Sequence, residues 1–165
     1  MRKSAAAMGS SVFMALAPGT VAGLVPWWLT RWQAGHWWLP VRVLGGVALA
    51  AGAAVLVHAF ARFVTEGLGT PAPVAPTEHL VVGGLYRHVR NPMYVAVVAA
   101  IAGQGLLLAR PVLLGYALVA GAAMAAFARW YEEPALLRAH GTAYERYRGA
   151  VPARAAAAAL AGTAP

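Results

Sequence analysis

Residues 93–128 read MYVAVVAAIAGQGLLLARPVLLGYALVAGAAMAAFA, and the only charge in this stretch is Arg110. Two apolar runs, Met93–Ala109 and Val112–Ala128, are joined by Arg110-Pro111. Each run is close to the roughly 20 residues that a helix needs to cross the hydrocarbon core of a bilayer. A connection of two residues between them is typical of a tight helical hairpin. The stretch therefore predicts two antiparallel membrane-spanning helices.

Two further apolar runs precede this hairpin, Met8–Leu29 without a charge and Val43–Ala61 interrupted only by His58. Of all residues, 61% are apolar and 11% charged, against roughly 25% charged in a soluble domain. We therefore expect an all-α integral membrane bundle of one domain, 1–165, with four spans near 8–29, 43–61, 93–109 and 112–128. The first run resembles a signal peptide, but it continues past Ala17, which favours a retained span.

The basic residues indicate how the bundle is oriented. The chain has 13 Lys+Arg and 5 acidic residues, and cytoplasmic loops carry most of the Lys and Arg of membrane proteins. With the N-terminus inside, only Arg31, Arg42 and Arg110 face outward. The inner set is Arg2, Lys3, Arg62, Arg87, Arg90, Arg129, Arg138, Arg146, Arg148 and Arg154. We expect both termini to be cytoplasmic. An Ala- and Arg-rich, Lys-poor composition favours the bacterial inner (plasma) membrane.

The first polar segment, residues 65–94, lies between the second and third spans. Pro71, Pro73 and Pro76 in its first half exclude a continuous helix. Residues 80–82 predict a short extended piece, and Gly83-Gly84 a turn. Polar side chains then gather at the start of the third span. Aromatic and basic residues often anchor a helix at the membrane interface, but this role does not explain Asn91-Pro92 at the start of the span or Tyr94 one turn inside the helix.

The second polar segment, residues 129–152, follows the fourth span. Pro134 suits the first turn of a helix and Gly141 its end, while Thr142 with Glu145 fits a capping box. The piece is amphipathic and suits the bilayer surface. The paired acids Glu132-Glu133 gain little there unless they bind a cationic or hydroxylated group. The two segments together predict a cytosolic pocket for a polar cofactor beside a lipid-soluble substrate.

Other functional classes are disfavoured by the sequence. The five histidines have no metal-binding spacing, and there is no cysteine and no GxSxG motif. No basic stripe interleaved with aromatic residues indicates nucleic-acid binding. We therefore expect neither a metal ion nor a nucleic acid as a partner; the expected partners are the bilayer and a lipophilic or amphiphilic acceptor.

The blocks EHLVVGGLY (78–86) and RNPMY (90–94) resemble the signature of the isoprenylcysteine carboxyl methyltransferase family. The paired glutamates and a tail of Gly141, Tyr144, Tyr147, Val151 and Pro152 extend the resemblance. Asn91-Pro92-Met93-Tyr94 with Tyr131-Glu132-Glu133-Pro134 is also similar to the phospholipid methyltransferases. This resemblance implies a membrane methyltransferase that uses S-adenosylmethionine, held in a pocket that the C-terminal helices close.

Site residues follow from the resemblance by position. The implied cofactor-binding set is Glu78, His79, Leu80, Val81, Tyr86, Arg90, Asn91, Pro92, Met93, Tyr94, Glu132 and Glu133. Asn91 and Arg129 are the candidates for catalysis. Asn91 stands where eukaryotic members have His, so it can hydrogen-bond but not titrate, and Arg129 is nearest to an arginine that faces the substrate.

These residue types suit methyl transfer. Glu132 or Glu133 fits the cofactor's amino group and ribose hydroxyls, Arg90 or helix N–H groups fit its carboxylate, and the aromatic faces of Tyr86 or Tyr94 fit its sulfonium or adenine. A carboxylate, thiol or amine acceptor remains open. Two alternatives also remain: a membrane reductase that uses NADPH, and a non-enzymatic scaffold or small transporter, for which Gln104 and His58 are the only mid-span polar candidates.

Overall fold

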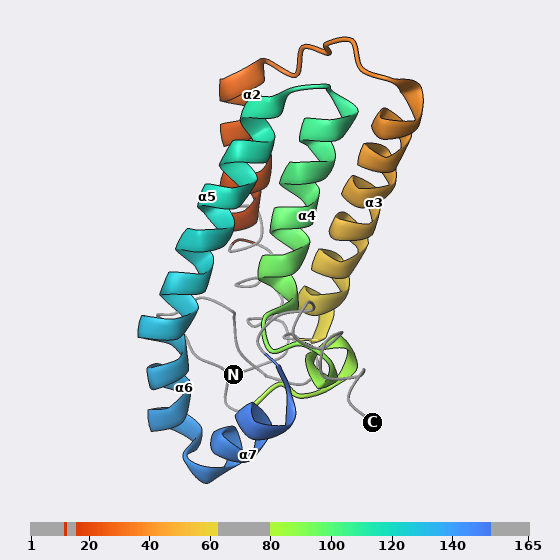
Figure 1. Cartoon of the computed structure of the whole chain (residues 1–165). Helices are drawn as coiled ribbons and strands as arrows, with labels where there is room; N and C mark the ends of the chain where they lie inside the picture. Colours follow the sequence, from red (N-terminus) through yellow and green to blue (C-terminus); the bar gives the residue numbers. More distant parts are fainter. Residues whose placement is uncertain (1–11, 13–15, 63–79, 153–165) are drawn as a thin grey trace.

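The computed structural model describes residue 12 and residues 16–62 and 80–152, and the regular elements of these residues are helices. In Figure 1, α4 (Pro92–Leu107) lies between α3 (Leu39–Arg62) and α5 (Pro111–Phe127). α2 (Val25–Thr30) lies near the end of the bundle where α4 turns into α5. α2, α3, α4 and α5 run in alternating directions (Figure 1), so the expected all-α class and the α4–α5 hairpin are confirmed.

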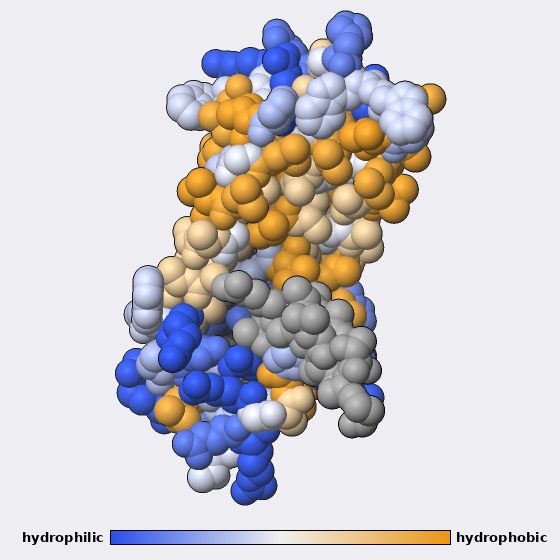
Figure 2. Space-filling view, in the orientation of Figure 1, coloured by the Kyte–Doolittle hydropathy of each residue, from blue (hydrophilic) through white to orange (hydrophobic). Residues whose placement is uncertain are grey.

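The described helices include two that are long and apolar enough to cross a membrane, α3 and a continuous helix over Pro111–His140. α4 is apolar but shorter. Figure 2 shows apolar residues in a band over the upper part of the bundle, with hydrophilic residues at both ends. Residues 16–30 of the expected first span are helical, and most of its earlier part lies outside the described residues.

Glycines allow α3 and α4 to pack with their backbones in contact. A Cβ atom on Gly45 would lie 2.7 Å from the carbonyl oxygen of Gly103, and one on Gly52 would lie 2.8 Å from that of Ala96. Neither distance leaves room for a side chain. Small residues let membrane helices approach closely and gain van der Waals contact, as expected for this Gly-rich sequence.

The short connection between α4 and α5 consists of Leu108, Ala109 and Arg110, and Ala109 has a positive φ of 53°. Pro111 begins α5 instead of belonging to the connection. Two of the predicted outer arginines bond to backbone carbonyls here. Arg42 Nε donates to Leu107 O at 2.9 Å, and Arg110 Nε donates to Gln33 O at 2.8 Å. Arg110 therefore holds the loop before α3 against the hairpin, and Arg42 holds the start of α3 against it.

Proline shapes the first helix. Pro26 has no N–H, and the chain just before it forms a π-turn, η1 (Thr20–Leu24), in which the Val25 N–H donates to Thr20 O. The carbonyls of Val21 and Ala22 are thereby left without the backbone donors of an α-helix. Tyr116 Oη donates to Val21 O at 2.9 Å, and Gln104 Nε2 donates to Ala22 O at 2.6 Å. Gln104 is thus a helix–helix contact, which removes one of the two polar candidates for a transport path.

A second π-turn before a proline continues the helix of α5 beyond the apolar band. In the π-turn η4 (Ala128–Glu132), the Glu133 N–H donates to Ala128 O, and Pro134 follows. α6 (Glu133–His140) extends the line of α5 (Figure 1), so the expectation of a separate piece along the bilayer surface is wrong.

Gly141 ends α6, as predicted, and begins α7 (Thr142–Ala150) with a φ of 52°. It is Gly141 that caps α7, and no side chain bonds to this helix start. The predicted capping box of Thr142 and Glu145 is therefore wrong, because the sharp turn at Gly141 already places Thr142 inside the helix.

Candidate functional site

The turn before α4 forms one wall of the site. Residues 80–82 are outside regular structure, and Gly84 has a φ of 58° where the 3-10 turn η3 (Gly84–Arg87) begins. A Cβ on Gly84 would lie 2.8 Å from His58 Nε2, so this turn lies directly against the end of α3. Tyr86 is buried with Val81 and Ala59, and Met93 packs on them. The predicted turn at Gly83-Gly84 is confirmed, and residues 80–82, predicted to be extended, lie outside helix and strand.

The C-terminal segment is fastened to this wall. Tyr147 Oη donates to Tyr86 O at 2.7 Å, and the Arg90 N–H donates to Pro152 O at 2.9 Å. Val151 is buried. Tyr147, Val151 and Pro152 of the tail motif therefore hold α7 against the turn that leads into α4.

Glu132 meets the RNPMY block through Tyr94. Tyr94 Oη donates to a carboxylate oxygen of Glu132 at 2.9 Å, across 38 positions of sequence. Tyr94 is one turn inside α4, and Glu132 ends the π-turn η4. A charge-assisted hydrogen bond of this kind orients both groups more strongly than a neutral one.

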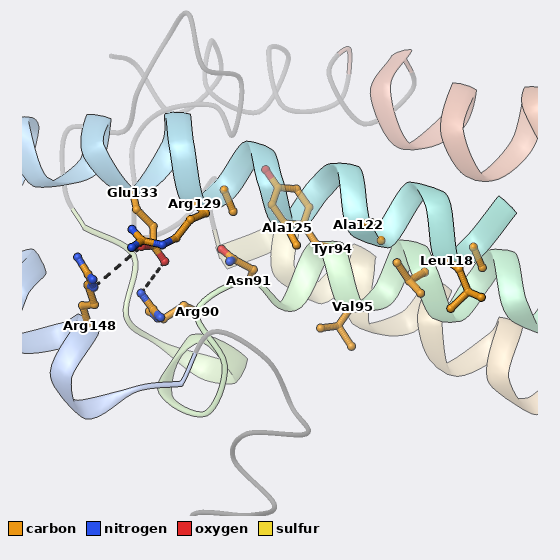
Figure 3. Close-up of a pocket in the computed structure, with 14 residues that line it drawn as sticks. Arg90, Asn91, Tyr94, Val95, Leu118, Ala122, Ala125, Arg129, Glu133 and Arg148 are labelled. Carbon is orange, nitrogen blue, oxygen red and sulfur yellow. Dashed lines mark hydrogen bonds and ion pairs between the residues drawn. The ribbon is translucent and has the colours of Figure 1, made fainter. Parts of the chain in front are cut away.

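Glu133 has different partners from Glu132. Its Oε1 accepts from Arg90 Nη1 at 2.7 Å, and its Oε2 lies 3.8 Å from Arg129 Nη1 and 3.9 Å from Arg148 Nε. The Arg90 and Glu133 side chains are 14% and 10% exposed, whereas those of Arg129 and Arg148 are 66% and 46% exposed. We call these four residues the arginine cluster; Figure 3 shows them at one end of the pocket.

A cavity of about 740 Å³ extends from the arginine cluster between α4 and α5. This volume lies within the range of small-molecule sites. Polar residues line one end and small or aliphatic residues the other (Figure 3). The lining residues are Arg90, Asn91, Tyr94, Val95, Val98, Ala117, Leu118, Gly121, Ala122, Ala125, Ala128, Arg129, Glu133 and Arg148.

Two hydrogen-bond donors on this wall, the Asn91 side-chain amide and Arg90 Nε, have no hydrogen-bonding partner among the described residues. Asn91 is the N-cap of α4, yet its side chain makes no capping bond and lines the cavity instead. Asparagine at this position normally accepts a bond from the first turn of the helix. Within the described part of the chain, the buried Arg90 Nε has no hydrogen-bond partner. Both groups suit a polar ligand.

The tyrosines outside the membrane-spanning helices stay protonated. Burial raises the pKa of Tyr86, and the charge of Glu132 raises it further. Burial also raises the pKa of Tyr144 and Tyr147, against an opposing effect of Arg90. These phenols are therefore neutral at physiological pH, and none of them is a phenolate base.

The structure brings most of the predicted site residues together. Arg90, Asn91, Tyr94, Arg129 and Glu133 line the cavity, and Glu132 contacts it through Tyr94. Leu80, Val81, Tyr86, Pro92 and Met93 form the wall behind it and are absent from the cavity lining. Glu78 and His79 lie outside the described residues.

Sequence reasoning missed Arg148 and the apolar end of the cavity. Arg148 reads as one more basic residue for lipid headgroups, and only its place on α7 brings it to Glu133. Gly121 reads as a helix-packing residue. Its spacing from other small residues gives no sign that it lines a cavity.

A sequence model described as phospholipid methyltransferase matches residues 41–143, from the start of α3 to the start of α7. The chain belongs to this family. It is therefore a membrane methyltransferase that uses S-adenosylmethionine and acts on lipid substrates. No curated protein and no solved structure matches it.

Proposed function

We propose that the chain transfers the methyl group of S-adenosylmethionine to a lipophilic or amphiphilic acceptor at the membrane–cytosol interface, with a carboxylate, thiol or amine as the acceptor group. The observation that carries this proposal is the meeting of the RNPMY block with the paired glutamates. Tyr94–Glu132 and Arg90–Glu133 join positions 38 and 43 residues apart. Both contacts lie beside a cavity with a polar and an apolar end.

The residues present fit this cofactor. The Glu132 carboxylate, oriented by Tyr94, suits the amino group or ribose hydroxyls, and the unpartnered Nε of Arg90 suits the carboxylate. S-adenosylmethionine supplies an electrophilic methyl group on a sulfonium. The protein then has to align two reactants and exclude water, which can supply much of the rate.

The other predicted site residues have supporting roles in this proposal. Asn91 orients the reacting groups through its free amide, and Arg129 contacts the acceptor. We also propose, as the family resemblance implies, that the cofactor-binding set includes Glu78, His79, Leu80, Val81, Tyr86, Pro92 and Met93. Glu133 contributes to cofactor binding by positioning Arg90 through their ion pair.

We also propose four spans, with both termini and the site on the cytosolic side of a bacterial inner membrane, in one domain. The helical residues 16–30, α3, α4 and α5 supply the four antiparallel segments. Arg31, Arg42 and Arg110 lie in or next to the connections at the end away from the site, in agreement with the positive-inside rule.

Calorimetric titration of the purified protein with S-adenosylmethionine tests the cofactor site. We expect Glu132→Gln to weaken binding by about 10-fold or more, because a charge-assisted bond contributes roughly 1.5–3 kcal/mol. Asn91→Ala is expected to weaken binding to a smaller extent. Glu145→Gln is the matched control, since Glu145 is an exposed glutamate of α7. Equal affinity in Glu132→Gln and Glu145→Gln would contradict the assignment of Glu132.

A second titration addresses the alternatives. The reductase hypothesis requires NADPH to bind in place of S-adenosylmethionine. The hypothesis of a scaffold or small transporter requires that neither cofactor binds. Family membership opposes both alternatives, and the structural role of Gln104 opposes a transport path. Binding of S-adenosylmethionine alone is the expected result.

A further inference from the structure

The apolar end of the cavity is a groove along two helices that opens at the surface. It runs from Ala128, the first residue of η4, along α5 to Ala117, and on α4 it includes Val95 and Val98. Leu118 lines it and is 77% exposed. Two packed helices lie about 8–10 Å apart, so a groove between them is about one aliphatic chain wide.

Gly121 sets the depth of this groove. A Cβ atom at Gly121 would lie 3.2 Å from Cγ2 of Val98 on the opposite helix. A side chain larger than methyl would therefore extend into the groove. Gly115, one and a half turns earlier on α5, differs in this respect, since a Cβ there meets nothing within 4 Å and the residue does not line the cavity.

The polar end of the groove carries surplus positive charge. Three guanidinium groups surround the one carboxylate of Glu133, and one positive charge remains even when the neighbouring Glu132 is counted. Arg129 and Arg148 are only loosely paired, at 3.8 and 3.9 Å, and their side chains are the exposed ones. Their donors are available to an anion that enters from the groove.

We propose that the α4–α5 groove holds the single aliphatic chain of an acceptor with an anionic head, that Arg129 and Arg148 select the head, and that Gly121 determines how much chain fits. This inference rests on the proposed methyl transfer for its biological meaning, but the groove can be tested without the cofactor. The anionic head of such an acceptor complements the positive charge at the polar end of the groove. Its aliphatic chain contacts the apolar residues along the rest of the groove.

The test uses spin-labelled stearic acid and its methyl ester, which share one chain and differ in head charge. Each is added at pH 9 to the protein in phosphatidylcholine vesicles, and the motionally restricted fraction is measured by electron paramagnetic resonance. We expect stearate to associate about fivefold more than the ester, since two partly exposed ion pairs contribute modestly. The double variant Arg129→Gln/Arg148→Gln should remove this preference while unfolding at the wild-type temperature.

The chain contact is tested by a matched pair on one helix. Gly121→Leu should reduce the restricted fraction of both probes, and Gly115→Leu should leave it unchanged. The proposal is overturned if stearate and its ester associate equally, if the preference survives loss of both arginines, or if the two glycine variants behave alike. Spin-labelled phosphatidylcholine restricted as strongly as stearate would also overturn it, since the groove would then be an ordinary lipid contact. Failure of the cofactor site appears separately, in the Glu132→Gln titration.

Discussion

The protein contains two π-turns of the same construction, and they differ in what their free carbonyls contact. In η1 the Val25 N–H donates to Thr20 O before Pro26, and in η4 the Glu133 N–H donates to Ala128 O before Pro134. The carbonyls that η1 frees accept hydrogen bonds from Gln104 and Tyr116. Among the described residues, no side chain donates to the corresponding carbonyls of Arg129 and Trp130.

The surroundings of the two turns account for this difference. η1 packs within the apolar band, where a bare carbonyl costs several kcal/mol, so the neighbouring helices must supply donors. η4 lies at the hydrophilic end, where Arg129 and Trp130 are exposed and water can satisfy the backbone (Figure 2). The first turn therefore serves the bundle. At the second, the side chains of Glu132 and Glu133 are available to build the site, in line with the frequent occurrence of π-bulges at functional sites.

The largest expected effect separates the paired glutamates, Glu132 at the end of η4 and Glu133 at the start of α6. Glu133→Gln should lower the free energy of unfolding by about 2 kcal/mol, because the largely buried Arg90 loses its countercharge. Glu132→Gln should cost much less stability, since the new amide can still accept from Tyr94. Denaturation in mixed micelles measures both, with Glu145→Gln as an exposed control. Equal losses of stability in Glu132→Gln and Glu133→Gln would refute this difference between the two glutamates.

The next effect concerns η1. Gln104→Met keeps the length of the side chain but removes the donor to Ala22 O, which has no backbone donor because of Pro26. We expect a loss of about 1 kcal/mol in the free energy of unfolding, within the range of interhelical hydrogen bonds in membranes. Gln33→Met is the control, since Gln33 is exposed and its hydrogen bonds among the described residues, to Thr30 O and from Arg110 Nε, are made by its backbone N–H and carbonyl. A loss no larger than that of the control would show that η1 does not need this donor.

These two turns also mark the limit of what the sequence predicts. Apolar runs and hairpin chemistry predict α3, α4 and α5 to within a few residues, because burial in lipid dictates their length and composition. The motifs predict that Arg90, Tyr94 and the glutamates meet. Proline signals a break in a helix but does not say that a π-turn will absorb it, so the continuation of α5 into α6 is not predictable.

The separate partners of Glu132 and Glu133 depend on tertiary structure in the same way. The two residues are adjacent in sequence, and only the helical rotation between them and the fold of α7 decide that one meets Tyr94 and the other Arg148. The groove at Gly121 depends on how α4 and α5 pack, which no local pattern records.

A smaller effect is expected at the second donor to η1. Tyr116→Phe removes the hydroxyl that bonds to Val21 O and leaves the ring in place. We expect a loss of about 0.6 kcal/mol, the average for such bonds in membranes. Tyr131→Phe is the matched control, because Tyr131 is half exposed and lies in η4. A loss at Tyr131 as large as that at Tyr116 would argue that the two turns have the same need for side-chain donors.

The smallest effect tests whether proline is the reason that η1 needs Gln104. Pro26→Ala adds an N–H four residues after Ala22, which can donate to the carbonyl that Gln104 now satisfies. The cost of Gln104→Met should then fall by about 0.5 kcal/mol in the Pro26→Ala background, a coupling that a double-mutant cycle resolves. Pro134→Ala should show no coupling to Gln104, because its new N–H lies at the other turn. If the cost of Gln104→Met is the same in all three backgrounds, the amide acts through packing and the carbonyl of Ala22 does not require it.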